Sequence, residues 1–123
     1  QLKNRPAVGI SMKLPLMLRN LGTLYIAGAD TIRLDRYETY SLVNENEKGI
    51  SDVSFELILD ENEKFISLIS GLENKEIEYT DETRIVKLCT IHANKKNKLG
   101  DFVLVAHYNG VDYTKTIKII PLW

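Results

Sequence analysis

With 123 residues, of which 44% are hydrophobic and 27% charged, the chain has the length and composition of one folded domain. Its formal net charge of −1 argues against binding to nucleic acid or to an anionic membrane that is driven by bulk charge. No stretch reaches the roughly 20 consecutive apolar residues that a membrane span requires. We therefore expect a single domain, with no nucleic-acid partner and no membrane span.

The single cysteine, Cys89, excludes an intramolecular disulfide, so the fold must be stable without one. It lies in an alternating run, which predicts a buried small hydrophobic side chain rather than a reactive thiol.

Residues 1–22 differ in residue pattern from the rest of the chain. Pro6 and Pro15 argue against a helix and against a central strand. Apolar side chains recur there with a period of two, at Ile10, Met12, Leu14, Leu16 and Leu18. The segment is either a linker or edge strand that packs on its own domain, or an extended arm. As an arm it would use these five side chains to dock on a neighbouring domain or subunit, or to form a homo-oligomer. Because the first residue is Gln1 rather than Met, we expect a domain cut from a longer polypeptide or a processed chain.

From Thr23 onward the sequence consists of short β-rich runs separated by polar or glycine-containing turns. The first four runs are 23–27, 31–34, 37–43 and 53–59. In the last of them every second residue is apolar and is expected to face a core: Val53, Phe55, Leu57 and Leu59.

Residues 60–71 fit either a short helix or a strand. Asp60 and Glu63 resemble a helix capping box, whereas the phenylalanine and isoleucines that follow favour a strand, which we prefer. Residues 72–82 are acidic, and we expect a loop there with one brief extended piece at 77–79.

Residues 84–93 alternate as a strand does. One face carries Cys89, Ile91 and Ala93, and the other carries Leu88, Thr90 and His92. A basic turn at 94–100 follows.

Residues 100–123 hold the strongest structural signal. Asn109-Gly110 lies between two alternating β-rich runs, and both residues accept the positive φ that a two-residue hairpin turn requires. Such a turn pairs Tyr108 with Val111, Ala106 with Tyr113, Leu104 with Lys115 and Phe102 with Ile117. Lys115 then lies on the core parity, which it can occupy near a sheet edge or by extending its amine to solvent.

Together these runs give about seven to nine short strands with turns every 8–12 residues, which is typical of an all-β antiparallel sandwich or small barrel. We predict one such domain at 23–123, preceded by the extended arm at 1–22.

The closing stretch resembles the last strands of bacterial immunoglobulin-like domains of the group 2 type. These domains occur in bacterial surface proteins and at the C-terminal end of bacteriophage tail and other virion structural proteins. The likeness is carried by Gly100, Phe102, Leu104, Ala106, Tyr108, Asn109, Gly110, Tyr113 and Ile117. The runs 53–57 and 89–93 look like earlier strands of the same family. The likeness covers about residues 23–120 and implies an immunoglobulin-like β-sandwich, although the paired cysteines and core tryptophan of antibody domains are absent.

No catalytic signature emerges from the residue pattern. Serine and threonine are scattered without a Gly-x-Ser-x-Gly turn, and no Cys–His arrangement is visible. His92 and His107 lie opposite the core parity of their strands, and two histidines alone do not close a zinc site. We therefore expect no enzyme and no cofactor.

Three weaker features have simple structural interpretations. The acidic turns at 44–47 and 60–63 offer oxygen ligands of the kind calcium prefers, but without EF-hand spacing. The basic loop at 94–98 could contact phosphate or an anionic glycan. We interpret these segments as solvated turns. The tyrosines could form a platform for a sugar, although half-buried positions at the rim are the simpler expectation.

The sequence therefore favours a non-catalytic structural and interaction module of a larger phage virion (tail) protein. It would give assembly contacts with other virion or parent-protein subunits, or weak attachment to a host surface. The alternative is a bacterial surface adhesion or carbohydrate-binding module, located on the cell surface, with a glycan as partner. Exposed aromatic side chains at one end of the sandwich would favour this alternative.

Overall fold

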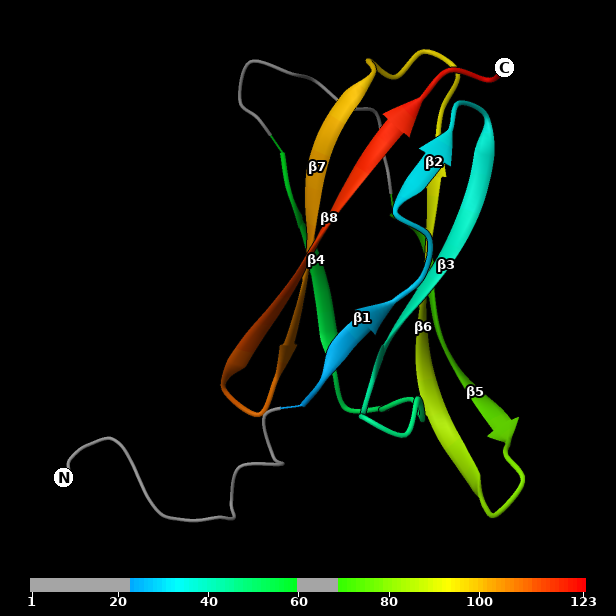
Figure 1. Ribbon diagram of the computed structural model, residues 1–123, viewed down its shortest axis with the longest axis vertical. Helices are drawn as coiled ribbons and strands as arrows, with labels where there is room; N and C mark the ends of the chain where they lie inside the picture. The colour runs from blue at the N-terminus through cyan, green and yellow to red at the C-terminus, as the bar shows by residue number, and fades with distance from the viewer. Residues whose placement is uncertain (1–22, 60–68) are drawn as a thin grey trace, which may run out of the picture.

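The computed structural model describes residues 23–59 and 69–123, which form two packed four-stranded sheets (Figure 1). In chain order the strands are β1 (Tyr25–Ala27), β2 (Thr31–Arg33), β3 (Arg36–Val43), β4 (Ser54–Ile58), β5 (Ile69–Glu78), β6 (Thr83–Ala93), β7 (Gly100–Tyr108) and β8 (Val111–Ile120). One sheet has the order β1-β3-β6-β5 and the other β2-β8-β7-β4. Within these residues no helix is long and apolar enough to cross a membrane.

The strand order is that of an immunoglobulin-type sandwich. With β1, β3, β6 and β5 as strands A, B, E and D, and β4, β7 and β8 as C, F and G, the two sheets have the order that defines this fold. The predicted all-β sandwich is therefore confirmed.

One strand pair departs from the predicted antiparallel arrangement. After β1 the chain turns at residues 28–30 and crosses to the second sheet, where β2 runs parallel to β8. The turn at 28–30 moves the chain from one sheet to the other without reversing its direction. As a result β1 runs antiparallel to β3 and β2 runs parallel to β8.

The β7–β8 hairpin forms in the predicted register, from Tyr108 opposite Val111 to Phe102 opposite Ile117. Asn109 and Gly110 adopt φ values of 56° and 80°, which is what the two-residue turn requires. The inward side chains of this hairpin pack against those of the other sheet in one core cluster. That cluster includes Ile26, Tyr40, Leu42, Phe55, Cys89, Ile91, Phe102, Leu104, Ala106, Ile117 and Ile119.

Lys115 occupies the core parity as predicted, and its amine extends to the surface. Its side chain is only 17% exposed, and Nζ lies 2.6 Å from a carboxylate oxygen of Asp30. Because β2 pairs only with residues 118–120 of β8, the β8 backbone at Lys115 lies at the sheet edge.

The other predicted faces are largely confirmed. Cys89, Ile91 and Ala93 of β6 are fully buried. In β4, Phe55 is buried and Leu57 partly buried, but Leu59 follows the end of the strand and is exposed.

The prediction of a loop at 72–82 was wrong. Residues 69–78 form β5, a ten-residue strand that pairs antiparallel with β6. All of its side chains except Ile69 and Ile77 are exposed, so β5 is held by its backbone hydrogen bonds to β6 and carries no hydrophobic alternation in its sequence.

Several sequence-based predictions lie outside the described residues. These are the arm at 1–22 with its five apolar side chains, the acidic turn at 60–63, and the choice between helix and strand over 60–68. They stay predictions.

Gly28 gives a test of the packing between the sheets. Its φ is +148°, and a Cβ added there would lie 2.2 Å from a ring carbon of buried Tyr40. We expect Gly28→Ala to lower the free energy of unfolding by about 2–4 kcal/mol, through backbone strain and displacement of that ring. Urea denaturation measures the change.

The matched control is Gly71→Ala in β5, where an added Cβ meets nothing within 4 Å. It should change stability by less than about 0.5 kcal/mol. Equal effects of the two substitutions would contradict the packing described for Tyr40.

Candidate functional site

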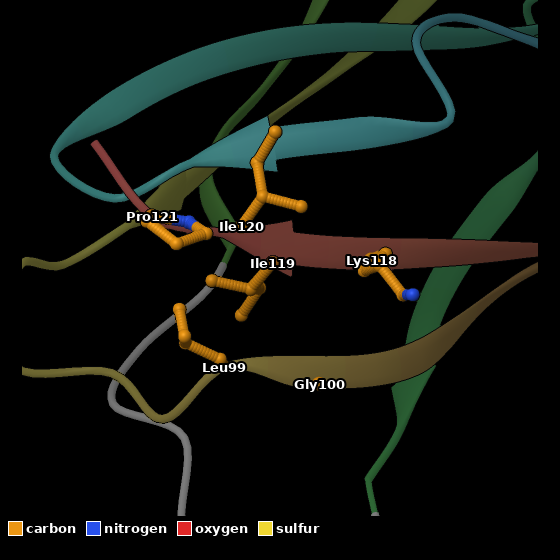
Figure 2. A pocket seen from close by; sticks show the side chains of 6 residues that line it. All are labelled: Leu99, Gly100, Lys118, Ile119, Ile120 and Pro121. Carbon is orange, nitrogen blue, oxygen red and sulfur yellow. The ribbon is translucent and has the colours of Figure 1, made fainter. Parts of the chain in front are cut away.

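At one end of the sandwich β8 ends, β7 begins and β2 turns into β3 (Figure 1). Two hollows lined largely by apolar side chains lie at this end. A first hollow there has a volume of about 370 Å³. It is lined by Leu99, Gly100, Lys118, Ile119, Ile120 and Pro121. Figure 2 shows the Leu99 side chain directed toward Ile119, with Pro121 beside them.

A second hollow of about 470 Å³ adjoins the first, because Pro121 lines both. Its lining is Leu34, Asp35, Lys95, Pro121, Leu122 and Trp123. Trp123 is 93% exposed and Leu99 49%. We call the surface formed by Leu34, Leu99, Ile120, Pro121, Leu122 and Trp123 the C-terminal end surface.

Two hydrogen bonds hold the chain beside this surface. The Leu34 N–H donates to the Ile120 carbonyl at 3.0 Å, and Arg33 Nη1 donates to the Pro121 carbonyl at 3.1 Å. Pro121 has no N–H with which to continue the ladder, so β8 ends before it. The last two residues are thereby placed beside the β2–β3 turn. The charged residues Asp35, Lys95 and Lys118 also line the hollows.

His107 lies on the outer face of the other end of β7, between two carboxylates. Its Nδ1 is 2.6 Å from Asp112 Oδ1 on β8, and its Nε2 contacts Glu56 Oε1 on β4. Because Asp112 and Glu56 accept hydrogen bonds from the ring, they raise the pKa of His107 above its ordinary 6.5. Only the imidazolium can donate from both nitrogens, so the charged ring ties three strands together.

This trio is poorly arranged for a metal ion, because the two carboxylates contact opposite nitrogens of the ring. His92, on β6 of the other sheet, stacks on Tyr37 with ring centroids 4.3 Å apart. The two histidines are therefore not neighbours. Among the described residues no group of three or more His, Cys, Asp or Glu side chains could hold a metal ion.

In the acidic turn at 44–47, a side-chain oxygen binds backbone N–H groups of the turn itself. Asn44 Oδ1 accepts hydrogen bonds from the N–H groups of Asn46 at 2.9 Å and Lys48 at 3.1 Å. This arrangement closes the turn and agrees with the predicted structural role.

A second polar cluster anchors the β5–β6 hairpin to that turn. Lys48 Nζ lies 2.6 Å from Asp81 Oδ1 and 2.8 Å from Glu82 Oε2. These contacts raise the pKa of Lys48 and lower the pKa values of both carboxyls. The N–H of Gly49 donates to the Tyr79 hydroxyl at 2.9 Å. The charges in this cluster are paired with one another rather than directed at a ligand.

The remaining reactive side chains are used in the core or spread over the surface. Burial raises the pKa of the Cys89 thiol to about 11, which agrees with the predicted hydrophobic role. Tyr40 is buried, and its hydroxyl donates to the Ala29 carbonyl at 2.7 Å. Tyr25 and Tyr37 are exposed, but Tyr25 lies opposite Val43, at the other end of β3 from Tyr37, so these two rings do not gather into the platform considered above.

The C-terminal end surface was missed by the sequence reasoning. Its members come from three segments that are distant in sequence, around residues 34, 99 and 121. The one local signal was the apolar Pro121-Leu122-Trp123 run directly after a strand.

No known family model matches the sequence, and no curated protein matches it. Among solved structures, the fold is similar to that of surface layer protein SbsC, domains 6–7, with a TM-score of 0.45 and 14% sequence identity. The similarity covers 82% of this chain and 47% of that one, so the chain spans about half the length of the structure it matches.

The His107 arrangement predicts a pH dependence of stability. Because the pKa of His107 is raised in the folded state, its stabilising contribution is fully present below pH 6.5 and is lost as the pH rises through the raised value. The stability difference between the wild type and His107→Asn should therefore shrink as the pH rises above 6.5.

An NMR titration of the His107 ring measures its pKa directly. Asp112→Asn removes the largest cause of the shift and should lower the pKa of His107. Asp101→Asn, on the same strand as His107, should leave that pKa unchanged. A wild-type pKa at or below 6.5 would contradict the geometry.

Proposed function

We propose that this chain is a non-catalytic structural module of a larger protein or assembly, and that it contacts its neighbour through the C-terminal end surface. The observation that carries the proposal is the gathering of exposed apolar side chains around Pro121, with Trp123 93% exposed and Leu99 49%. Apolar surface of this kind is stabilised when a partner removes it from water.

The polar clusters support a module without catalysis. His107 and Lys48 are each paired with two carboxylates, and the Cys89 thiol is buried in the core. None of these groups lines the two hollows of the C-terminal end surface. The charged rim would instead help to orient a partner over an apolar centre.

We propose a phage virion, and in particular its tail, as the location. This part of the proposal rests on the likeness of residues 100–117 to immunoglobulin-like domains of virion structural proteins. A bacterial cell surface is the alternative. The partners would be other subunits or domains of the same assembly.

A fluorescence experiment tests the contact, because Trp123 is the only tryptophan in these 123 residues and the difference between wild type and Trp123→Phe isolates its emission in a larger assembly. Acrylamide should quench Trp123 fully in the isolated chain. It should quench Trp123 much less in the parent polypeptide or assembled particle, where a neighbour covers the surface.

Two variants of matched exposure give the control. Leu99→Ser should restore quenching in the assembled state, whereas Val111→Ser, at the β7–β8 turn, should not; both wild-type side chains are 49% exposed. Equal quenching of Trp123 in the isolated and assembled forms would overturn the proposal.

A second candidate function is the binding of a cell-surface glycan. Trp123 offers an exposed ring beside Asp35 and Lys95, and sugars are bound by an aromatic face with polar groups at its edge. On a glycan array, Trp123→Ala should abolish binding of a retained glycan, and Tyr25→Ala, at the opposite end of the sandwich, should leave it unchanged. Failure of the wild type to retain any glycan would exclude this candidate.

A further inference from the structure

The two ends of the sandwich carry unpaired charges of opposite sign. Beside the C-terminal end surface, the loop between β6 and β7 contains Lys95, Lys96 and Lys98, which are all exposed. None of these lysines makes an ion pair with a residue in the described parts of the chain. Lys95 lines the second hollow together with Trp123 and a single carboxylate, Asp35. Unpaired positive charge therefore lies directly beside the apolar side chains.

The turn that follows β3 lies at the opposite end and is acidic. β3 begins beside the C-terminal end surface and runs the length of the sandwich, so the turn at 44–48 lies at the far end (Figure 1). Glu45 and Glu47 in this turn are exposed, and neither makes an ion pair with a described residue. The one cation of the turn, Lys48, is already paired with two carboxylates of the β5–β6 turn. Negative charge is left uncompensated here.

An exposed aromatic ring adjoins the acidic turn. Tyr25 on β1 lies opposite Val43, which is the last residue of β3 and directly precedes the turn. Its neighbour Ile26 is buried in the core, so the Tyr25 side chain points to the other face of the sheet, where it is 45% exposed. We call the surface formed by Tyr25, Glu45 and Glu47 the acidic end surface.

The C-terminal end surface and the acidic end surface are complementary. Each has an exposed aromatic ring, Trp123 in one and Tyr25 in the other, with unpaired charge of one sign beside it. Two C-terminal end surfaces would bring lysines together, and two acidic end surfaces would bring glutamates together, so like ends repel. Contact between unlike ends brings opposite charges together and removes apolar surface from water on both sides. The charges therefore select a head-to-tail arrangement.

We propose that the C-terminal end surface of one copy of this chain binds the acidic end surface of a second copy. This inference rests on the function proposed above and names the partner of that contact. Because the two surfaces lie at opposite ends of one molecule, the contact repeats from copy to copy and builds a linear array rather than a closed dimer (Figure 1). Exposed ion pairs add little affinity, so the apolar contacts hold the copies together and the charges set their orientation.

A charge-swap experiment on the full chain tests the proposal. One variant carries Lys95→Glu and Lys98→Glu, and the other carries Glu45→Lys and Glu47→Lys. In sedimentation velocity at low salt, the wild type should form oligomers that grow with concentration. Each variant alone should associate at least about tenfold more weakly, because like charges then meet at the contact. An equimolar mixture should regain association, because every end then finds an end of opposite charge.

A matched variant separates the contact from the effect of net charge. Lys75→Glu with Lys87→Glu changes the net charge by the same amount as the first variant, but on the β5–β6 hairpin. It should associate as the wild type does.

The apolar part of the contact has its own pair of variants. Tyr25→Ser should weaken self-association, whereas Val111→Ser, at the β7–β8 turn and outside the acidic end surface, should not; the wild-type side chains are 45% and 49% exposed.

Three results would overturn the inference: a wild type that stays monomeric up to about 1 mM, growth that stops at a dimer, or a mixture of the charge-swap variants that fails to regain association. The function proposed above is judged separately. If the isolated chain stays monomeric but Trp123 is shielded in the assembled parent, only the head-to-tail partner is wrong. If Trp123 is quenched equally in the isolated and assembled forms, the proposed function fails as well.

Discussion

The β7–β8 pairing is the constraint on which the rest of the structure depends. These strands form the centre of one sheet, with β4 attached to β7 and β2 attached to β8. Their register places Phe102, Leu104 and Ile117 in the core, and a slip of one residue would turn each strand's buried side chains to the opposite face. The turn at Asn109 and Gly110 prevents that slip, because both residues adopt the positive φ that only a few residue types accept readily.

The polar contacts on the outer surfaces reinforce this arrangement. His107 on β7 contacts Asp112 on β8 and Glu56 on β4, and so connects three adjacent strands of the sheet. At the other sheet, the ion pairs of Lys48 with Asp81 and Glu82 hold the β5–β6 turn against the turn after β3. Lys115 joins the core side of β8 to Asp30 in the crossing between β1 and β2. These groups act on the fold, and none of them lines the hollows of the C-terminal end surface.

The sequence predicted those strands whose two faces differ in burial. In β6 and β7 the alternation of apolar and polar residues predicts which side chains face the core, and the Asn-Gly turn sets the hairpin register. The alternation pattern did not predict β5, because an edge strand that is held by backbone hydrogen bonds does not need alternating apolar and polar side chains. It also missed the parallel β2–β8 pair and the C-terminal end surface. Both depend on where the chain crosses between sheets, which brings Leu34, Leu99 and Pro121 together from three separate segments.

The most direct test of the account compares hydrogen exchange in the isolated chain with that in its assembled parent. If this domain is a structural module that contacts its neighbours through the C-terminal end surface, the amides that gain protection should cluster in residues 94–99 and 118–123. The outer face around Glu56, His107 and Asp112 should exchange at the same rate in both states. Protection centred on that His107 face, with the C-terminal end surface unchanged, would contradict the account.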